Sequence, residues 1–144
     1  MAAGSSEVVV RGSVAGFAQE ITVQSHRLFS DEPVDGGGQD SGPTPYQLLA
    51  AALGACTSMT LGIYARRKQW PLASVTVRLR HSKVHAEDCA NCENANVLLD
   101  RIDRDIEMVG DLSKDQRQKL LEIADKCPVH RTLTQGMRIY TRLL

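Results

Sequence analysis

The stretch GPTPYQLLAAALGACTSMTLGIYARRKQW, Gly42–Trp70, predicts one long helix. At its start, Thr44 and Gln47 have the spacing of a capping box, in which each side chain binds the backbone N–H of the other residue. Pro45 stands at the first helical position, where its missing N–H costs nothing. The basic run 66–68 lies where the negative end of the helix dipole favours positive charge. Both ends of the helix are therefore marked in the sequence.

Cys56 lies in the middle of this helix. At about 100° per residue it shares a face with mostly apolar residues, which are Leu49, Ala52, Leu53, Thr60 and Ile63. We therefore expect a packed stripe that holds a buried or half-buried thiol. The dipole effect fades within the first turn of a helix, so a reactive Cys56 needs a cation or a base from elsewhere in the fold. The alternative is a core cysteine that packs as a small hydrophobic residue.

A second face of this helix carries the small residues Ala51, Ala55, Ser58 and Gly62. Small side chains let another backbone approach closely. We therefore expect the helix to be central and covered on more than one side.

Length and composition indicate a single domain over residues 1–144, with residues 1–6 as a disordered lead-in. Seventeen basic residues balance seventeen acidic ones, which gives no electrostatic footprint for nucleic acid or anionic lipid. No signal peptide and no stretch of transmembrane length is expected, so we predict a cytoplasmic protein without a membrane partner. In that compartment cysteines are reduced at rest.

The rest of the chain reads mainly as strands. The segments 7–10 and 21–28 predict a hairpin or meander, and residues 31–45 a Gly-rich loop. Two paired strands are expected around Val75–Leu79 and Ile102–Met108. Ser113 and Gln116 form a second capping box before another helix, and residues 137–144 alternate as a closing strand. The order predicts an α+β fold with antiparallel sheets around the long helix.

Cys127 opens the segment CPVHRTL. Pro128 disfavours the helical conformation at Cys127, so the preceding helix should break there. Cys127 either ends that helix or caps a new short helix that starts at Pro128, and the two cases expose the thiol to opposite ends of a helix dipole. His130 and Arg131 either assist this thiol or are exposed residues after a helix end.

Two cysteines on two core-facing helices of a cytosolic protein suggest a reactive pair. A thiolate attacks the O–O bond of a peroxide and becomes a sulfenic acid, and a second thiol then closes a disulfide with it. Such a cycle uses no metal and no organic cofactor. It does require a positive group near the first thiolate.

The runs GPTPYQLLAAALGACTSMTLGIYARRK and IADKCPVHRTL resemble the OsmC/Ohr family of thiol-dependent peroxidases. The insertion HAEDCANCEN is similar to an OsmC-like branch that is found fused behind an α/β-hydrolase domain. The resemblance implies an intertwined α+β homodimer with active sites at the subunit interface. It also implies that Cys56 is the peroxidatic cysteine and Cys127 the resolving cysteine.

The sequence departs from the family pattern at the groups that activate the thiol. The peroxidase subgroups carry a glutamate ten positions before the first cysteine, and Tyr46 stands at that position here. The family arginine comes from the N-terminal hairpin turn, which is SVAGF in this chain. Arg11 and Arg27 flank the hairpin and are the candidate replacements.

Cys89 and Cys92 form a second group of possible ligands. With His85 they give H-x3-C-x2-C, and His81 shares a face with His85, so these four residues are candidate zinc ligands. A plain loop with two reduced thiols and a reversible disulfide are the other two interpretations.

We therefore expect a thiol-dependent hydroperoxide reductase that acts in oxidative-stress defence. Its partners would be a hydroperoxide substrate, an external dithiol reductant and a second copy of the chain. The alternative is a non-catalytic OsmC-like protein that binds a small ligand or a metal, with Cys56 as a core thiol.

Overall fold

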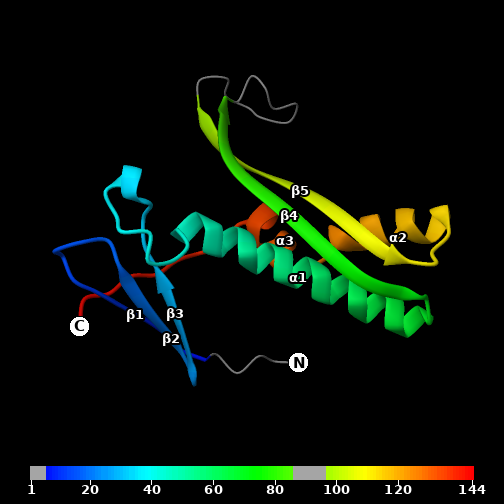
Figure 1. Ribbon diagram of the computed structural model, residues 1–144, viewed down its shortest axis with the longest axis horizontal. Coiled ribbons are helices and arrows are strands. Elements are labelled where there is room, and N and C mark those ends of the chain that lie inside the picture. Colours follow the sequence, from blue (N-terminus) through cyan, green and yellow to red (C-terminus); the bar gives the residue numbers. More distant parts are fainter. Residues whose placement is uncertain (1–5, 86–96) are drawn as a thin grey trace. The chain divides into compact units, whose positions relative to one another are not determined.

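The computed structural model describes residues 6–85 and 97–144, and the chain divides into two compact units, Met1–Leu49 and Ala50–Leu144. The described elements are β1 Val8–Gly12, β2 Gln19–Val23, β3 His26–Ser30, the 3-10 helix η1 Val34–Gly36, α1 Pro45–Lys68, β4 Leu72–His85, β5 Leu98–Gly110, α2 Lys114–Ala124 and α3 Pro128–Gln135 (Figure 1). The fold is of the α+β class with antiparallel sheets, as predicted. The expected single domain stays a prediction.

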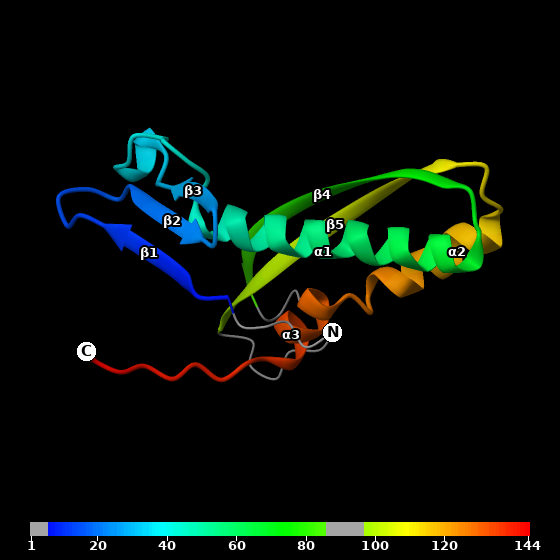
Figure 2. The same ribbon diagram turned by 90° about the horizontal axis from the view of Figure 1, so that it is seen from below.

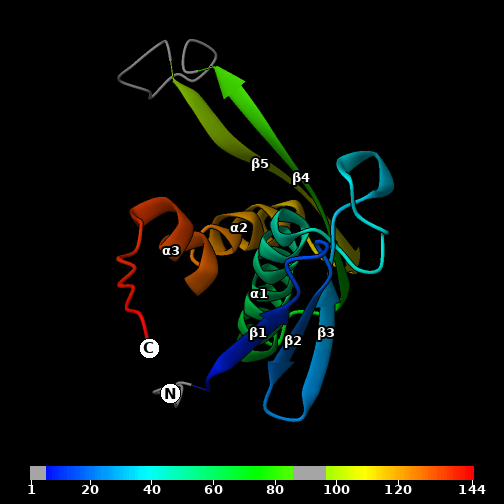
Figure 3. The same ribbon diagram turned by 90° about the vertical axis from the view of Figure 1, so that its left-hand side faces the viewer.

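The first unit holds an antiparallel meander in the order β1-β2-β3 (Figure 3). β1 pairs with β2 around the predicted turn, and β2 pairs with β3 from Gln19–Ser30 to Val23–His26. The run 21–28 is therefore two strands. Gln24 separates them with a φ of 53°, a left-handed conformation that suits a tight turn.

The Gly-rich loop after β3 is tied to one buried carboxylate. Asp31 is 2% exposed and accepts hydrogen bonds from the backbone N–H groups of Glu32, Gln39 and Ser41 and from the Ser41 hydroxyl. The Ser41 hydroxyl is the main cause that lowers the pKa of Asp31 to about 2. Gly38 packs so closely on the backbone of Glu32 that a Cβ there would overlap the Glu32 carbonyl. Gly38 is therefore needed for this close approach of the loop to Glu32.

The predicted capping signals mark both ends of α1. The Thr44 N–H donates to Gln47 Oε1 at 2.9 Å, and the Gln47 N–H donates to Thr44 Oγ1 at 3.2 Å. Pro45 is the first helical residue, and the basic residues 66–68 form the last turn.

β4 and β5 form the long antiparallel hairpin of the second unit (Figure 1). The register pairs Val77 with Ile106 and Leu79 with Arg104. Cross-strand ion pairs cover the outer face, as between Arg80 and Asp105 at 2.7 Å. The inner face is half-buried, and all three helices of this unit lie on that side (Figures 2 and 3).

The core of the second unit forms where α1 and α2 meet this inner face. Its buried members are Leu61, Ala65, Leu112, Leu120, Ile123 and Ala124, and Val75, Ile106 and Met108 from the hairpin pack against them. The capping box of Ser113 and Gln116 starts α2, as predicted. Apolar burial therefore fixes α2 against the second half of α1.

The packed stripe of α1 differs from the expectation. The buried residues are Leu53, Gly54, Thr57, Leu61 and Ala65, whereas Leu49 and Ile63 are 39% and 43% exposed. A Cβ on Gly54 would lie 2.7 Å from Leu79 Cδ1, so β4 packs where the helix has no side chain. Because α1 is apolar or small on most of its circumference, the helical periodicity of the sequence did not identify the side of α1 on which the sheet packs.

The predicted closing strand is absent. Residues 136–144 form neither helix nor strand, and Ile139 and Leu143 are 81% and 99% exposed. An alternating pattern only becomes a strand when a neighbouring strand accepts and donates its backbone hydrogen bonds. Among the described residues of this chain no strand does so for this segment.

α1 also reaches the length and apolar composition of a membrane span, contrary to the expectation that no stretch does so. Many residues of α1 are small and uncharged, so the mean hydropathy of the helix stays apolar although it has few large apolar side chains. Core helices meet the same criteria, and Leu61 and Ala65 of α1 lie in the hydrophobic core.

Candidate functional site

Cys127 lies at the junction of α2 and α3. α2 ends at Ala124, and Cys127 adopts an extended conformation as the N-cap of α3, with Pro128 at the first helical position. Its sulfur accepts a hydrogen bond from the His130 backbone N–H at 3.3 Å. Of the two cases left open by the sequence, the structure shows the helix start, where the dipole favours a negative sulfur.

The Cys127 sulfur contacts α1. It is fully buried and lies 3.9 Å from Oγ1 of Thr57, seventy positions earlier in the chain. Thr57 is also fully buried, and its hydroxyl donates to the Leu53 carbonyl at 2.8 Å. Because Thr57 follows Cys56 directly, the fold brings the second cysteine to the same turn of α1 as the first.

Cys56 itself is half-buried and free, in contrast to the fully buried Cys127. The expectation of a half-buried thiol is therefore confirmed, although its neighbour Thr57 faces the core. A reagent from solvent reaches Cys56 more readily than Cys127.

Arg104 brings a positive charge to this cluster from β5. Its Nη1 donates to Thr57 Oγ1 at 2.9 Å and to the Ala124 carbonyl at 3.4 Å, and its Nη2 pairs with Asp125 Oδ1 at 2.8 Å. The Arg104 side chain is only 12% exposed. The site thus contains a held cation, two free thiols and a helix start.

Sequence reasoning missed Arg104, although a signal was present. The inward phase of β5 reads Ile102, Arg104, Ile106 and Met108, so the arginine interrupts an apolar face. A charged residue in an apolar phase is a candidate for a buried partner. The candidates Arg11 and Arg27 lie in the first unit, where Arg27 pairs with Glu20 at 2.7 Å.

His130 and Arg131 both belong to α3. The His130 ring Nδ1 lies 3.9 Å from Asp125 Oδ1, on the carboxylate that also binds Arg104. Arg131 is exposed.

The candidate zinc ligands divide between described and undescribed parts of the chain. Cys89 and Cys92 lie outside the described residues. His81 Nε2 lies 2.8 Å from Asp100 Oδ1, which also pairs with Lys83 at 3.0 Å. The hydrogen bond from Lys83 is the main cause that lowers the pKa of Asp100, and the hydrogen bond with His81 is the next. Across residues 6–85 and 97–144, no three potential metal ligands gather.

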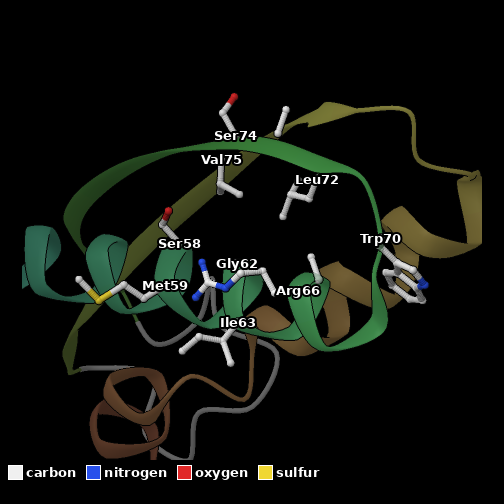
Figure 4. Close-up of a pocket in the computed structure, with 11 residues that line it drawn as sticks. Ser58, Met59, Gly62, Ile63, Arg66, Trp70, Leu72, Ser74 and Val75 are labelled. Carbon is white, nitrogen blue, oxygen red and sulfur yellow. The ribbon is translucent and has the colours of Figure 1, made fainter.

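A separate pocket opens between the second half of α1 and the start of β4 (Figure 4). Its volume is about 540 Å³, and its walls are mostly apolar. Met59 and Ile63 line it from α1, Leu72 and Val75 line it from β4, and Arg66 lies beside Gly62 (Figure 4). Neither Cys56 nor Cys127 lines this pocket.

A family model described as OsmC-like protein matches residues 37–142. No curated protein sequence matches the chain.

Several solved structures share the fold. An OsmC-like protein from Mycoplasma pneumoniae superposes with a TM-score of 0.73 at 16% identity, covering 93% of this chain and 89% of that one. An organic hydroperoxide resistance protein OsmC from Legionella pneumophila gives 0.69 at 19% identity, with 92% and 91% covered. The organic hydroperoxide resistance protein OhrB of Bacillus subtilis gives 0.63 at 22% identity, also with 92% and 91% covered. At these identities the likeness shows the fold alone.

Proposed function

The chain belongs to the OsmC-like protein family, and from this premise we propose that it reduces organic hydroperoxides with Cys56 and Cys127 in defence against oxidative stress. The observation that carries the proposal is the contact of the Cys127 sulfur with Thr57, the residue next to Cys56. Two of the solved structures reported above are named organic hydroperoxide resistance proteins, which supports the choice of substrate.

In the first step the Cys56 thiolate attacks one oxygen of the hydroperoxide. An S–O bond forms, the O–O bond breaks, and the alkoxide leaves as an alcohol after it takes a proton. The sulfur is oxidised to a sulfenic acid and the peroxide is reduced. Cys56 is suited to this step because it is half-buried, whereas Cys127 is enclosed.

In the second step the Cys127 thiolate attacks the sulfur of the sulfenic acid. An S–S bond forms, the S–O bond breaks, and hydroxide leaves as water after it takes a proton. An external dithiol then reduces the disulfide and returns both thiols. The cycle uses only the two sulfurs and needs no bound cofactor.

The test treats the reduced full chain with cumene hydroperoxide and maps peptides without reduction. We expect a disulfide between Cys56 and Cys127, and in Cys127→Ser a sulfenic acid on Cys56 that dimedone traps. The double variant Cys89→Ser/Cys92→Ser controls for the other two thiols and should behave as the wild type. Absence of both products would exclude the peroxidase function.

We further propose that the protein acts as a homodimer. Only 28% of the most apolar 18-residue part of α1 is buried within the chain, and Met59 is 67% exposed. An exposed apolar helix face is typical of an interface. A cytoplasmic location, where a dithiol reductant is available, accompanies this proposal.

The second candidate function is binding of a small apolar ligand. The pocket beside α1 supports it, because its volume falls in the range of ligand sites and Arg66 adds one positive group to apolar walls. Trp70, the only tryptophan of the chain, lines the pocket and reports on its contents. Titration with octanoate should change Trp70 fluorescence in the wild type and less so in Arg66→Gln. An unchanged spectrum would remove this candidate.

Metal binding is the other form of a non-catalytic function. Because Cys89 and Cys92 lie outside the described residues, it is tested by measuring metal on the full chain. Protein purified without chelator should contain stoichiometric zinc only if His81, His85, Cys89 and Cys92 bind it. A metal-free preparation that keeps full peroxidase activity would reject it.

A further inference from the structure

The positive charge of Arg104 lies near Cys127, and the two steps described above give it no role. Arg104 lies in β5, opposite Leu79 of β4, and extends toward α1 and the end of α2. Its side chain is 12% exposed and makes three hydrogen bonds, to Thr57, Ala124 and Asp125. A charge in such a setting costs free energy unless it is paired, and Asp125 is its partner here.

We propose that Arg104, held by Asp125, is a positioning residue that acts through the Thr57 hydroxyl to stabilise Cys127 as the thiolate that closes the disulfide with oxidised Cys56. This inference rests on the proposed function. It assigns a role to three residues, Arg104, Thr57 and Asp125, in the second step of the cycle.

The Thr57 hydroxyl can serve either form of Cys127. In the structure the hydroxyl donates to the Leu53 carbonyl, and its oxygen accepts from Arg104, so the Cys127 thiol is the group that donates to it. When Cys127 loses its proton, rotation of the hydroxyl hydrogen turns the same group into a donor to sulfur. A hydroxyl whose oxygen already accepts from a guanidinium is a stronger donor, because hydrogen bonds in a chain polarise one another.

Arg104 also offsets part of an opposing field. Cys127 follows the C-terminal end of α2, where exposed carbonyls carry partial negative charge. Arg104 binds the Ala124 carbonyl at that end. The thiol then experiences the N-terminus of α3 and the guanidinium, which both favour a negative sulfur.

Asp125 fixes the guanidinium by pairing with Nη2, which leaves Nη1 for Thr57. The carboxylate is 68% exposed, so its own charge is screened by solvent, whereas Arg104 is mostly enclosed. The pair therefore leaves a net positive influence on the buried side, where Cys127 lies.

The competing explanation is structural. Arg104 could merely cap α2 and join it to β5 and α1, without effect on the thiol. The two explanations differ in their effect on the equilibrium between dithiol and disulfide. Stabilising the Cys127 thiolate favours the reduced form, so a variant that loses this stabilisation has a disulfide that is harder to reduce. Loss of a structural contact loosens the site and makes the disulfide harder to form.

The experiment measures two quantities on the full chain. The first is the equilibrium between dithiol and disulfide in dithiothreitol redox buffers at fixed pH, which needs no peroxide. The second is the rate at which the disulfide closes after a single turnover with cumene hydroperoxide. The variants are Arg104→Gln, Arg104→Lys, Thr57→Val and Thr57→Ser. The control is Arg101→Gln, because Arg101 lies in the same strand but pairs with Asp103 on the exposed side.

In Arg104→Gln we expect closure about tenfold slower and an equilibrium about tenfold further toward disulfide, because hydrogen bonds to charged groups are the stronger kind. Thr57→Val should reproduce both changes without altering the charge. Arg104→Lys and Thr57→Ser should stay nearer to the wild type, and Arg101→Gln should equal it. An equilibrium that is unchanged or moves toward dithiol in Arg104→Gln and Thr57→Val overturns the inference.

The design separates this inference from the proposed function. If the wild type forms no disulfide between Cys56 and Cys127 in any redox buffer, both are overturned. If the disulfide forms in redox buffers but not with hydroperoxide, the peroxidase function fails, and the equilibrium measurement still decides whether Arg104 acts on Cys127.

Discussion

The guanidinium of Arg104 donates to the hydroxyl of Thr57 across 2.9 Å, which joins β5 to the turn of α1 that carries Cys56. The same hydroxyl lies 3.9 Å from the sulfur of Cys127. Three elements that are distant in sequence therefore meet at one buried threonine. This contact places Cys127 and Arg104 beside the residue that follows Cys56, which neither stretch of sequence shows alone.

The two thiols should differ in accessibility. With the native reduced protein, iodoacetamide should modify Cys56 well before Cys127, because Cys127 is fully buried and Cys56 is half-buried. Peptide mass spectrometry over time measures the order. In urea, where burial is lost, the difference should disappear. Equal rates in the native protein would contradict the proposed order of attack.

The Gly-rich loop should tolerate a methyl group at one glycine and not at another. Gly38→Ala places Cβ onto the Glu32 carbonyl, whereas Gly36→Ala meets Pro33 side-chain carbons at an ordinary 3.5 Å. We expect Gly38→Ala to lower the free energy of unfolding by about 1–3 kcal/mol, as overpacking does. Gly36→Ala is the matched control and should change it little. Chemical denaturation measures both, and equal losses would refute the close approach.

Asp31 should make stability depend on pH in the acid range. Its pKa is lowered to about 2 in the folded chain, mainly by the Ser41 hydroxyl, against about 3.8 for the free group. Because the folded pKa is the lower one, its stabilising contribution is complete above pH 4 and is lost as the pH falls from about 4 to 2.

Asp31→Asn should therefore reduce stability at pH 6 and lose less further stability between pH 4 and 2 than the wild type. Ser41→Ala, which removes the largest cause of the shift, should act in the same direction with a smaller effect. Unfolding curves at several pH values test this. An identical acid slope in wild type and Asp31→Asn would show that the loop carboxylate does not contribute.

The exposed face of α1 should mediate dimerisation. Met59→Glu or Ile63→Glu places a charge on a face where these side chains are 67% and 43% exposed. We expect either variant to shift a dimer toward monomer in light scattering, because burying an unpaired charge costs several kcal/mol. Val14→Glu, at an exposed position in the hairpin turn, is the control and should leave the dimer intact. A monomeric wild type at micromolar concentration would reject the proposal.

Local signals in the sequence predicted much of this fold. The capping boxes at Thr44 and Ser113 identified where two helices start, since a cap depends only on residues within one turn. Alternation around Val77 and Ile106 predicted the β4–β5 pair, because side chains on successive strand residues face opposite sides. The prediction of a closing strand over residues 137–144 was wrong, because a strand also needs a neighbouring strand, which a local pattern does not supply.

The sequence alone determined the helix that carries Cys56, the break at Cys127 and the family to which the chain belongs. Only the tertiary structure decided which side of α1 is buried and which cation reaches Thr57. Those two facts depend on Gly54 admitting β4 and on the register that places Arg104 opposite Leu79. Close packing and strand register are properties of segments brought together in space, so no single stretch of the chain encodes them.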